Sequence, residues 1–178
     1  MGEVRLVTAS LRPERYCASV SDIDPCSLAD AGVRAVLLDL DNTLLARGES
    51  EVPSDVEAWV RSLAGHGLAA CIVSNTSKPR VRHVAEQLDV PVVAGARKPS
   101  SKGYHRACAL LGVAPSEAVM VGDQSYTDVL GAHRAGMGAI LVMPLGTRDL
   151  LHTRLLRALD ALAVRGMRPE RRAGARQT

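Results

Sequence analysis

The chain has 178 residues, of which 47% are apolar, so its composition favours one globular domain and argues against a disordered protein. Its apolar runs are far shorter than the roughly 20 residues of a membrane-spanning helix, and its first residues do not resemble a secretory signal. The net charge of +3 is uneven, because residues 148–178 hold eight arginines against three acids. We therefore expect a cytoplasmic protein with a basic C-terminal tail.

Strand-like and helix-like patterns alternate along the chain. Short apolar runs predict five strands, at residues 33–40, 68–75, 90–96, 117–123 and 138–144. Helical patterns follow these strands, at residues 53–67, 78–89, 101–113, 125–136 and 149–164. This alternation is typical of a parallel sheet with helices on both faces. We predict an α/β fold: one Rossmann-like domain over residues 1–165 with a five-stranded parallel sheet, and a basic tail at 166–178 that we expect to be disordered.

Polar residues stand at or just beyond the ends of four predicted strands: Asp39, Ser74, Lys98 and Asp123. In an open parallel sheet these ends share one edge, which is where ligands bind. Asp39, Asp123 and the nearby Asp41 can supply oxygen ligands to Mg²⁺. Lys98, Ser74 and the amide of Asn75 can bind anionic oxygens. The pattern predicts a phosphate site bridged by magnesium.

Each of these motifs also has an ordinary structural interpretation. Ser74 and Asn75 can cap a helix, Lys98 can be a solvated surface residue, and Asp128 can be an acid in the first turn of a helix. The order of the motifs favours the functional interpretation, since all four occur in sequence and each stands at a strand end.

The segments "DLDNTL", "VSNTS", "RKP" and "VGDQSYTD" resemble, in order, the four motifs of the haloacid dehalogenase superfamily of phosphohydrolases. The resemblance covers roughly residues 33–144. Within class III A it is greatest to the YqeG-like branch, which is related to phosphatidylglycerophosphate phosphatases. The segment "GDQSYTDVLGAHRAG", with "ILVMPL" after it, carries that finer resemblance.

This resemblance implies a Mg²⁺-dependent phosphoric monoester hydrolase. Asp39 would be the nucleophile that forms an aspartyl-phosphate, and Asp41 would be the general acid and base. The backbone carbonyl of Asp41 and the carboxylates of Asp39 and Asp123 would hold Mg²⁺.

The resemblance also implies roles for the surrounding residues. Ser74 and Asn75 would bind phosphoryl oxygens, and Lys98 would offset charge on both the nucleophile and the phosphate. Thr43 would shape the loop after the nucleophile. Asp128 would orient Lys98 or a metal-bound water.

The spacing of the motifs bears on the substrate. Only 32 residues separate Asp41 from Ser74 and 23 separate Ser74 from Lys98, so we expect no cap domain. The stretch "LARGESEV" can form at most a flap over the site. An open site suits a substrate whose bulk stays outside, such as a lipid, a polymer or a protein, and the resemblance makes a phospholipid phosphate the leading candidate.

Two alternatives stay open. One is a phosphatase of a soluble nucleotide or sugar phosphate, and the other is a non-catalytic phosphate-binding or RNA-associated protein. The body of the chain lacks a basic stripe with interleaved aromatic residues, so we expect no specific nucleic-acid partner. The basic tail and the apolar face of the pattern at 149–164 allow peripheral contact with an anionic membrane.

Overall fold

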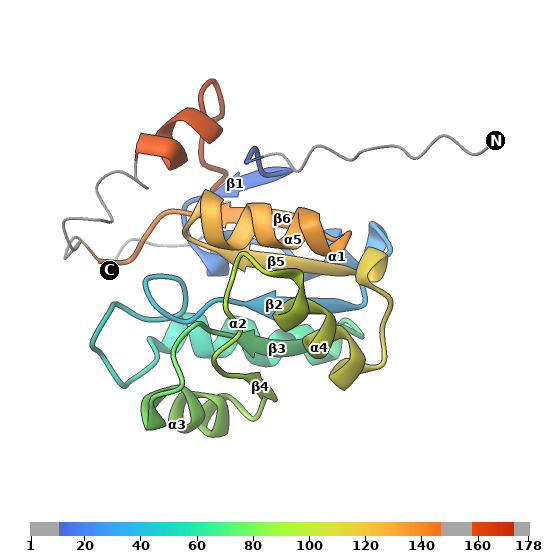
Figure 1. The fold of residues 1–178 in the computed structure, drawn as a ribbon, viewed down its shortest axis with the longest axis vertical. Helices are drawn as coiled ribbons and strands as arrows, with labels where there is room; N and C mark the ends of the chain where they lie inside the picture. Colours follow the sequence, from blue (N-terminus) through green and yellow to red (C-terminus); the bar gives the residue numbers. More distant parts are fainter. Residues whose placement is uncertain (1–10, 147–157, 173–178) are drawn as a thin grey trace.

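A computed structural model of the chain describes residues 11–146 and 158–172. At its centre is a sheet of six parallel strands in the order β1-β6-β5-β2-β3-β4 (Figure 1). The strands are β1 (Arg15–Cys17), β2 (Ala35–Leu38), β3 (Ala69–Val73), β4 (Val92–Val93), β5 (Ala118–Gly122) and β6 (Gly138–Val142).

The number of strands corrects the sequence prediction. The five predicted strands are all present as β2 to β6, but β1 adds a sixth at one edge by pairing with β6, where Tyr16 lies opposite Leu141. β1 has only three residues, and two of them are half-buried. A run this short carries no apolar period, which is why the sequence pattern did not indicate it.

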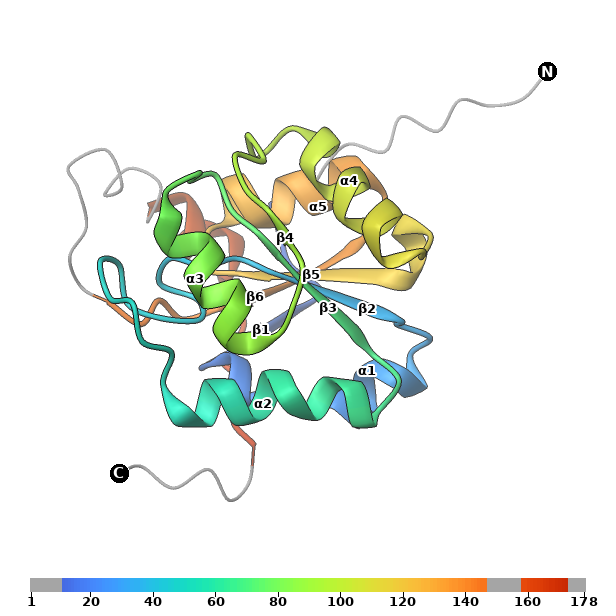
Figure 2. The same cartoon turned by 90° about the horizontal axis from the view of Figure 1, so that it is seen from below.

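Helices cover both faces of the sheet. They are α1 (Pro25–Asp30), α2 (Ser54–Gly65), α3 (Pro79–Leu88), α4 (Ser101–Leu111) and α5 (Leu130–Ala135), with the short helical turns η1 (Val20–Asp22), η2 (Pro115–Glu117) and η3 (Ser125–Val129). α1 and α2 lie on one face, and α4 and α5 on the other (Figure 2). α3 joins the core of the first face through Val81 and Val84. The α/β prediction with helices on both faces is confirmed.

The sequence of β2 explains why it lies in the middle of the sheet. Val36 and Leu38 face one core, Ala35 and Leu37 face the other, and all four side chains are fully buried. Successive side chains of a strand point to opposite faces, so a strand covered on both sides is apolar throughout. The first polar residue after such a run, Asp39, therefore marks the carboxyl edge of the sheet.

The C-terminal segment packs against β1, the strand at one side of the sheet. Residues 158–163 are helical, and Glu170 pairs with β1 through two backbone hydrogen bonds, from the Ala18 amide (2.9 Å) and to the Tyr16 carbonyl (2.8 Å). The start of the predicted helix at 149–164 and residues 173–178 of the predicted tail lie outside the described residues. The division at residue 165 stays a prediction. Within the described ranges, every helix is too short or too polar to cross a membrane.

Candidate active site

The predicted site residues meet at the carboxyl edge of the sheet. Asp39 follows β2 and its amide donates to the carbonyl of Val121 on β5 (2.9 Å), which extends the sheet to the predicted nucleophile. A hollow of about 150 Å³ opens there, lined by Asp39, Asp41, Arg47, Ser74, Asn75, Thr76, Lys98, Gln124 and Thr127. Residues from four separate stretches of the chain therefore share one small cavity.

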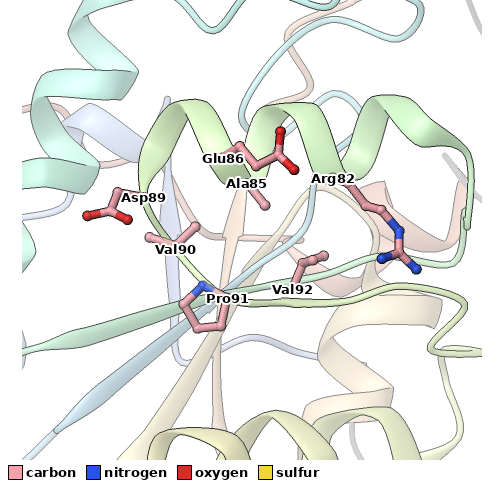
Figure 3. A pocket seen from close by; sticks show the side chains of 7 residues that line it. All are labelled: Arg82, Ala85, Glu86, Asp89, Val90, Pro91 and Val92. Atoms are coloured by element: carbon pink, nitrogen blue, oxygen red, sulfur yellow. The ribbon is translucent and has the colours of Figure 1, made fainter.

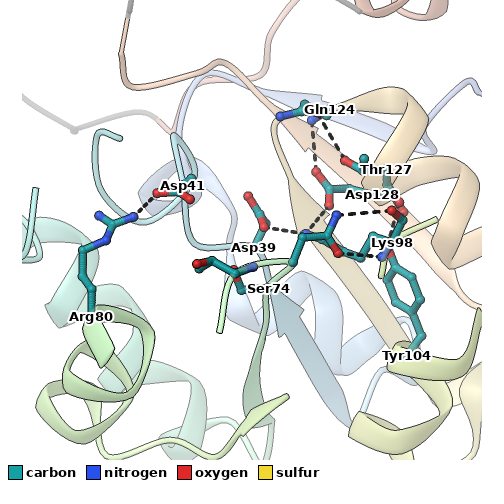
Figure 4. A network of polar contacts seen from close by, with 11 residues as sticks. Asp39, Asp41, Ser74, Arg80, Lys98, Tyr104, Gln124, Thr127 and Asp128 are labelled. Atoms are coloured by element: carbon teal, nitrogen blue, oxygen red, sulfur yellow. Dashed lines mark hydrogen bonds and ion pairs between the residues drawn. The ribbon is translucent and has the colours of Figure 1, made fainter. Parts of the chain in front are cut away.

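Lys98 lies at the centre of the polar network (Figure 4). Its ammonium donates to the carboxylate of Asp39 and to Oδ1 of Asp128 (2.7 Å), and its side chain is only 3% exposed. The side chain of Asn75 holds the Lys98 backbone on both sides, accepting from its amide (2.6 Å) and donating to its carbonyl (3.2 Å). The Asn75 side chain thus positions Lys98. The binding of phosphate by Asn75 stays a prediction.

Asp128 reaches this network because of a glycine. A Cβ on Gly122 would lie 2.3 Å from Cγ of Asp128, so any side chain there would displace the carboxylate. Oδ2 of Asp128 also accepts a hydrogen bond from the amide of Gln124 (3.1 Å). Asp128 therefore contacts Lys98, and its predicted role in orienting Lys98 or a metal-bound water stays a prediction.

Three buried carboxylates form a candidate metal site. Oxygen atoms of Asp39, Asp123 and Asp128 all lie within 4.8 Å of one another. Among the buried side chains of residues 11–146 and 158–172, Lys98 is the one basic group, so this cluster carries more negative than positive charge. Carboxylate oxygens suit Mg²⁺, and a divalent cation would offset the excess. These residues therefore fit such an ion. Asp39 and Asp123 were predicted as its carboxylate ligands, and Asp128 lies in the same cluster.

The carboxylate of Asp41 has a partner that the sequence analysis missed. Arg80, in the first turn of α3, donates to Asp41 (Figure 4). It also donates to the carbonyl of Glu49. The place of Arg80 in the sequence could have predicted this contact. The helix after Ser74 must begin at the carboxyl edge of the sheet, where the site lies, and Arg80 is in its first turn. Arg80 thus links the predicted general acid to the stretch at 45–52 that was predicted to form a flap.

Thr43 and Arg47 lie on the loop after Asp39. Thr43 is buried, and the amide of Arg47 donates to Oδ1 of Asn42 (3.2 Å), which closes the loop. Asn42 adopts a left-handed conformation (φ 64°), which asparagine tolerates better than most residues. The exposed Arg47 lines the hollow and is a second cation that the sequence analysis missed.

Burial sets the electrostatics of the nucleophile position. It raises the pKa of the Asp39 carboxyl to about 6, an effect that the Lys98 charge opposes and the Asp128 charge reinforces. Burial also acts to lower the pKa of Lys98, but the Asp128 and Asp39 carboxylates outweigh it, so that pKa lies above its ordinary value. Lys98 therefore stays protonated, and burial disfavours the ionised form of Asp39.

A larger hollow of about 420 Å³ lies between α3 and the segment that leads into β4 (Figure 3). Its charged side chains are Arg82, Glu86 and Asp89. It includes none of the predicted site residues.

The fold and this site define a class of protein. Residues 28–136, more than half of the chain, match the sequence model of the haloacid dehalogenase-like hydrolases, and the chain belongs to that family. The prediction of a phosphoric monoester hydrolase of this family is confirmed.

Individual relatives agree with that assignment. The chain is 33% identical over 148 residues to a probable phosphatase, YqeG, of Bacillus subtilis, covering 83% of this chain and 86% of that one. It is 28% identical over 144 residues to phosphatidylglycerophosphate phosphatase 1 of the Chlamydomonas reinhardtii chloroplast, covering 76% of this chain and 54% of that one. A phosphatase of the same superfamily from Thermococcus onnurineus shares the fold, with a TM-score of 0.53, 21% identity, and coverage of 67% of this chain and 90% of that one.

The raised pKa of Asp39 leads to a stability prediction for the metal-free protein. Above pH 6 the Asp39 carboxylate is charged in both states, but only the folded state buries that charge, which lowers the free energy of unfolding. Well below the ordinary pKa of 3.8 the carboxyl is protonated in both states, and this cost disappears. We expect Asp39→Asn to raise the melting temperature in chelator at about pH 8, and the gain to shrink toward about pH 4. Each kcal/mol shifts the melting temperature by about 2–4 °C in a chain of this size.

Differential scanning fluorimetry across this pH range measures the gain. The matched control is Glu86→Gln, which removes an exposed carboxylate and should change little at any pH. A gain for Asp39→Asn that is the same at all pH values would contradict the assignment of the buried charge.

Proposed function

We propose that this chain is a Mg²⁺-dependent phosphatase that hydrolyses a phosphate monoester through an aspartyl-phosphate on Asp39. The observation that carries the proposal is the cluster of Asp39, Asp123 and Asp128 around Lys98 beside a hollow lined by Ser74. The cluster combines a nucleophile, ligands for a hard cation and donors for an anion within one buried network.

The proposed reaction proceeds in two steps. A carboxylate oxygen of Asp39 attacks phosphorus, the bond to the ester oxygen breaks, and Asp41 gives its proton to the departing alcohol. Asp41 then takes a proton from water, whose oxygen attacks the phosphorus of the aspartyl-phosphate and releases Asp39 and inorganic phosphate. Before it can act on the leaving group, the carboxylate of Asp41 must turn from Arg80 toward the ester oxygen.

The surrounding residues bind and orient the phosphoryl group. Ser74 and the amide of Asn75 would donate to its oxygens, and Lys98 would offset charge on both the group and Asp39. A bound Mg²⁺ would supply charge neutralisation between nucleophile and phosphate, held by Asp39, Asp123 and the carbonyl of Asp41.

We also propose that the site has no cap and that the body of the substrate stays outside. Between Asp41 and Ser74 the chain forms a loop, α2 and β3, and between Ser74 and Lys98 it forms α3 and β4, which leaves little room for a further domain. The hollow of about 150 Å³ is smaller than the roughly 300–1,000 Å³ of pockets that enclose whole small molecules. Its size suits a phosphoryl group.

Exposed apolar side chains on segments next to the hollow support a lipid phosphate. Tyr126 is 42% exposed and follows Gln124 of the hollow by two residues. Leu145 is also 42% exposed, and its amide donates to the carbonyl of Asn42 (2.9 Å), so it lies next to the nucleophile loop. The named activity of the chloroplast relative agrees with a phosphatidylglycerophosphate-like substrate.

Phosphate release from matched esters tests this function. We expect the purified protein with Mg²⁺ to hydrolyse phosphatidylglycerophosphate in mixed micelles with kcat/KM at least about tenfold above that for glycerol 3-phosphate, since its acyl chains would add apolar contact outside the hollow. Asp39→Asn should lower kcat by about 10⁴-fold or more, because the amide is a poor nucleophile.

A larger kcat/KM for a nucleotide or sugar phosphate would instead identify a soluble substrate. Absence of hydrolysis for every ester, with phosphate still bound, would indicate a non-catalytic phosphate-binding protein. Turnover by Asp39→Asn near the wild-type rate would exclude Asp39 as the nucleophile.

Metal removal tests the role of the carboxylate cluster. We expect chelation to abolish hydrolysis and Mg²⁺ to restore it, because the ion would neutralise charge between the nucleophile and the phosphate. Asp123→Asn should raise the Mg²⁺ concentration for half-maximal activity by about tenfold or more. Full activity in a protein shown by elemental analysis to be free of metal would contradict the mechanism.

Membrane contact through the C-terminal segment is a separate proposal. Arg168 and Arg171 are exposed, and each would add at most about 1 kcal/mol of attraction to an anionic surface. We expect a variant with both changed to Gln to bind vesicles containing phosphatidylglycerol more weakly in a sedimentation assay, and to hydrolyse glycerol 3-phosphate unchanged. These substitutions are preferable to deletion of the tail at 166–178, because that deletion would remove Glu170, which pairs with β1. Equal vesicle binding at low salt would contradict this proposal.

A further inference from the structure

The turn between two of the clustered aspartates, Asp123 and Asp128, is held by a residue far along the chain. Oδ1 of Asp160 accepts a hydrogen bond from the backbone amide of Ser125 at 2.6 Å, and both residues are buried. Asp160 belongs to the short helix formed by residues 158–163, which lies beyond the residues 28–136 that match the family (Figure 1). The motifs of the family therefore do not account for this contact.

The contact lies between two of the clustered aspartates in the sequence. Asp123 stands two residues before Ser125, and Asp128 stands three residues after it. The amides of Gln124 and Ser125 open the helical stretch formed by η3 and α5, and each donates to a carboxylate: Gln124 to Asp128 (3.1 Å) and Ser125 to Asp160. A carboxylate at the first amides of a helix also interacts favourably with its dipole.

The helix that bears Asp160 is itself anchored near the sheet. The charge of Asp160 adds to burial in raising the pKa of Tyr16, which places the carboxylate near β1. Seven residues beyond the helix, Glu170 pairs with β1 and its side chain accepts from Arg15 (2.6 Å). Asp160 thus joins the turn after β5 to a segment that is fixed on the edge strand.

We propose that Asp160 is a positioning residue that fixes the turn at residues 123–125, so that Asp123 can bind the metal ion and Asp128 can hold Lys98 beside it. A buried carboxylate is costly, and an apolar side chain would fill the same space at lower cost. The charge-assisted bond to the Ser125 amide requires an acceptor oxygen at this position, which an apolar side chain lacks. The inference rests on the proposed metal-dependent function, and it concerns Mg²⁺ binding in the absence of substrate.

Calorimetric titration of Mg²⁺ into the full chain tests this role directly. We expect Asp160→Ala to weaken Mg²⁺ binding about tenfold, the lower end of the range for residues that orient metal ligands. Asp160→Asn keeps an oxygen acceptor and should stay within about threefold of the wild type. The control is Leu162→Ala, on the same helix, whose side chain is 63% exposed and whose loss should not change Mg²⁺ binding.

A second variant removes the other partner of the hydrogen bond. Ser125 is the first residue of the helical stretch, where proline is tolerated, and Gln124 before it is extended (φ −127°, ψ 121°), as a residue preceding proline prefers. Ser125→Pro deletes the donating amide and leaves Asp160 in place, so it should weaken Mg²⁺ binding to a similar extent. In the Ser125→Pro background, Asp160→Ala should then add little, which a double-mutant cycle measures.

Activity provides a second measurement. Asp160→Ala should raise the Mg²⁺ concentration for half-maximal hydrolysis and leave kcat at saturating Mg²⁺ within about threefold, whereas general loss of structure would lower kcat at every concentration. Wild-type affinity for Mg²⁺ in Asp160→Ala and Ser125→Pro, with a lowered melting temperature, would overturn the inference and leave the proposed function standing. Absence of Mg²⁺ binding by the wild type would overturn both.

Discussion

The excess of negative charge around one buried ammonium is the constraint on which this structure depends. Lys98 contacts Asp39 and Asp128, and Asp123 lies within the same 4.8 Å cluster. Buried groups with more negative than positive charge must be held firmly, because a small displacement breaks a hydrogen bond that water does not replace. Asn75 supplies part of that restraint by binding the Lys98 backbone on both sides. The excess of carboxylates over ammonium in this cluster is the physical argument for the proposed metal ion.

The convergence of these groups could be predicted because a parallel sheet makes it a consequence of local sequence. A strand buried on both faces is an uninterrupted apolar run, and the first polar residue beyond it lies at the carboxyl edge. Asp39, Ser74 and Asp123 each occupy that position after β2, β3 and β5. Lys98 stands five residues beyond the two-residue strand β4, so the loop brings it to the edge. Order along the chain was therefore sufficient to group the candidate site.

Other features could not be predicted, because they depend on contacts that leave no periodic signal. β1 is three residues long, and its place in the sheet follows from pairing with β6, more than 120 residues away. The contacts of Arg80 with Asp41 and of Asp160 with Ser125 join residues that are 39 and 35 positions apart. A single charged side chain on a helix is normally solvated. Only the packing of the folded chain distinguishes these two from the other charged residues.

The same geometry separates the chemistry from the choice of substrate. The proposed reacting groups lie at the strand ends, and the hollow beside them has room for little more than a phosphoryl group. Any discrimination between esters must therefore come from side chains around its opening. Arg47 lines the hollow, and the exposed apolar Tyr126 and Leu145 stand on segments next to it, which is the basis for proposing an ester with an anionic head and an apolar body. Because these side chains lie on loops, they can change without disturbing the buried charges, so relatives with the same cluster can act on different esters.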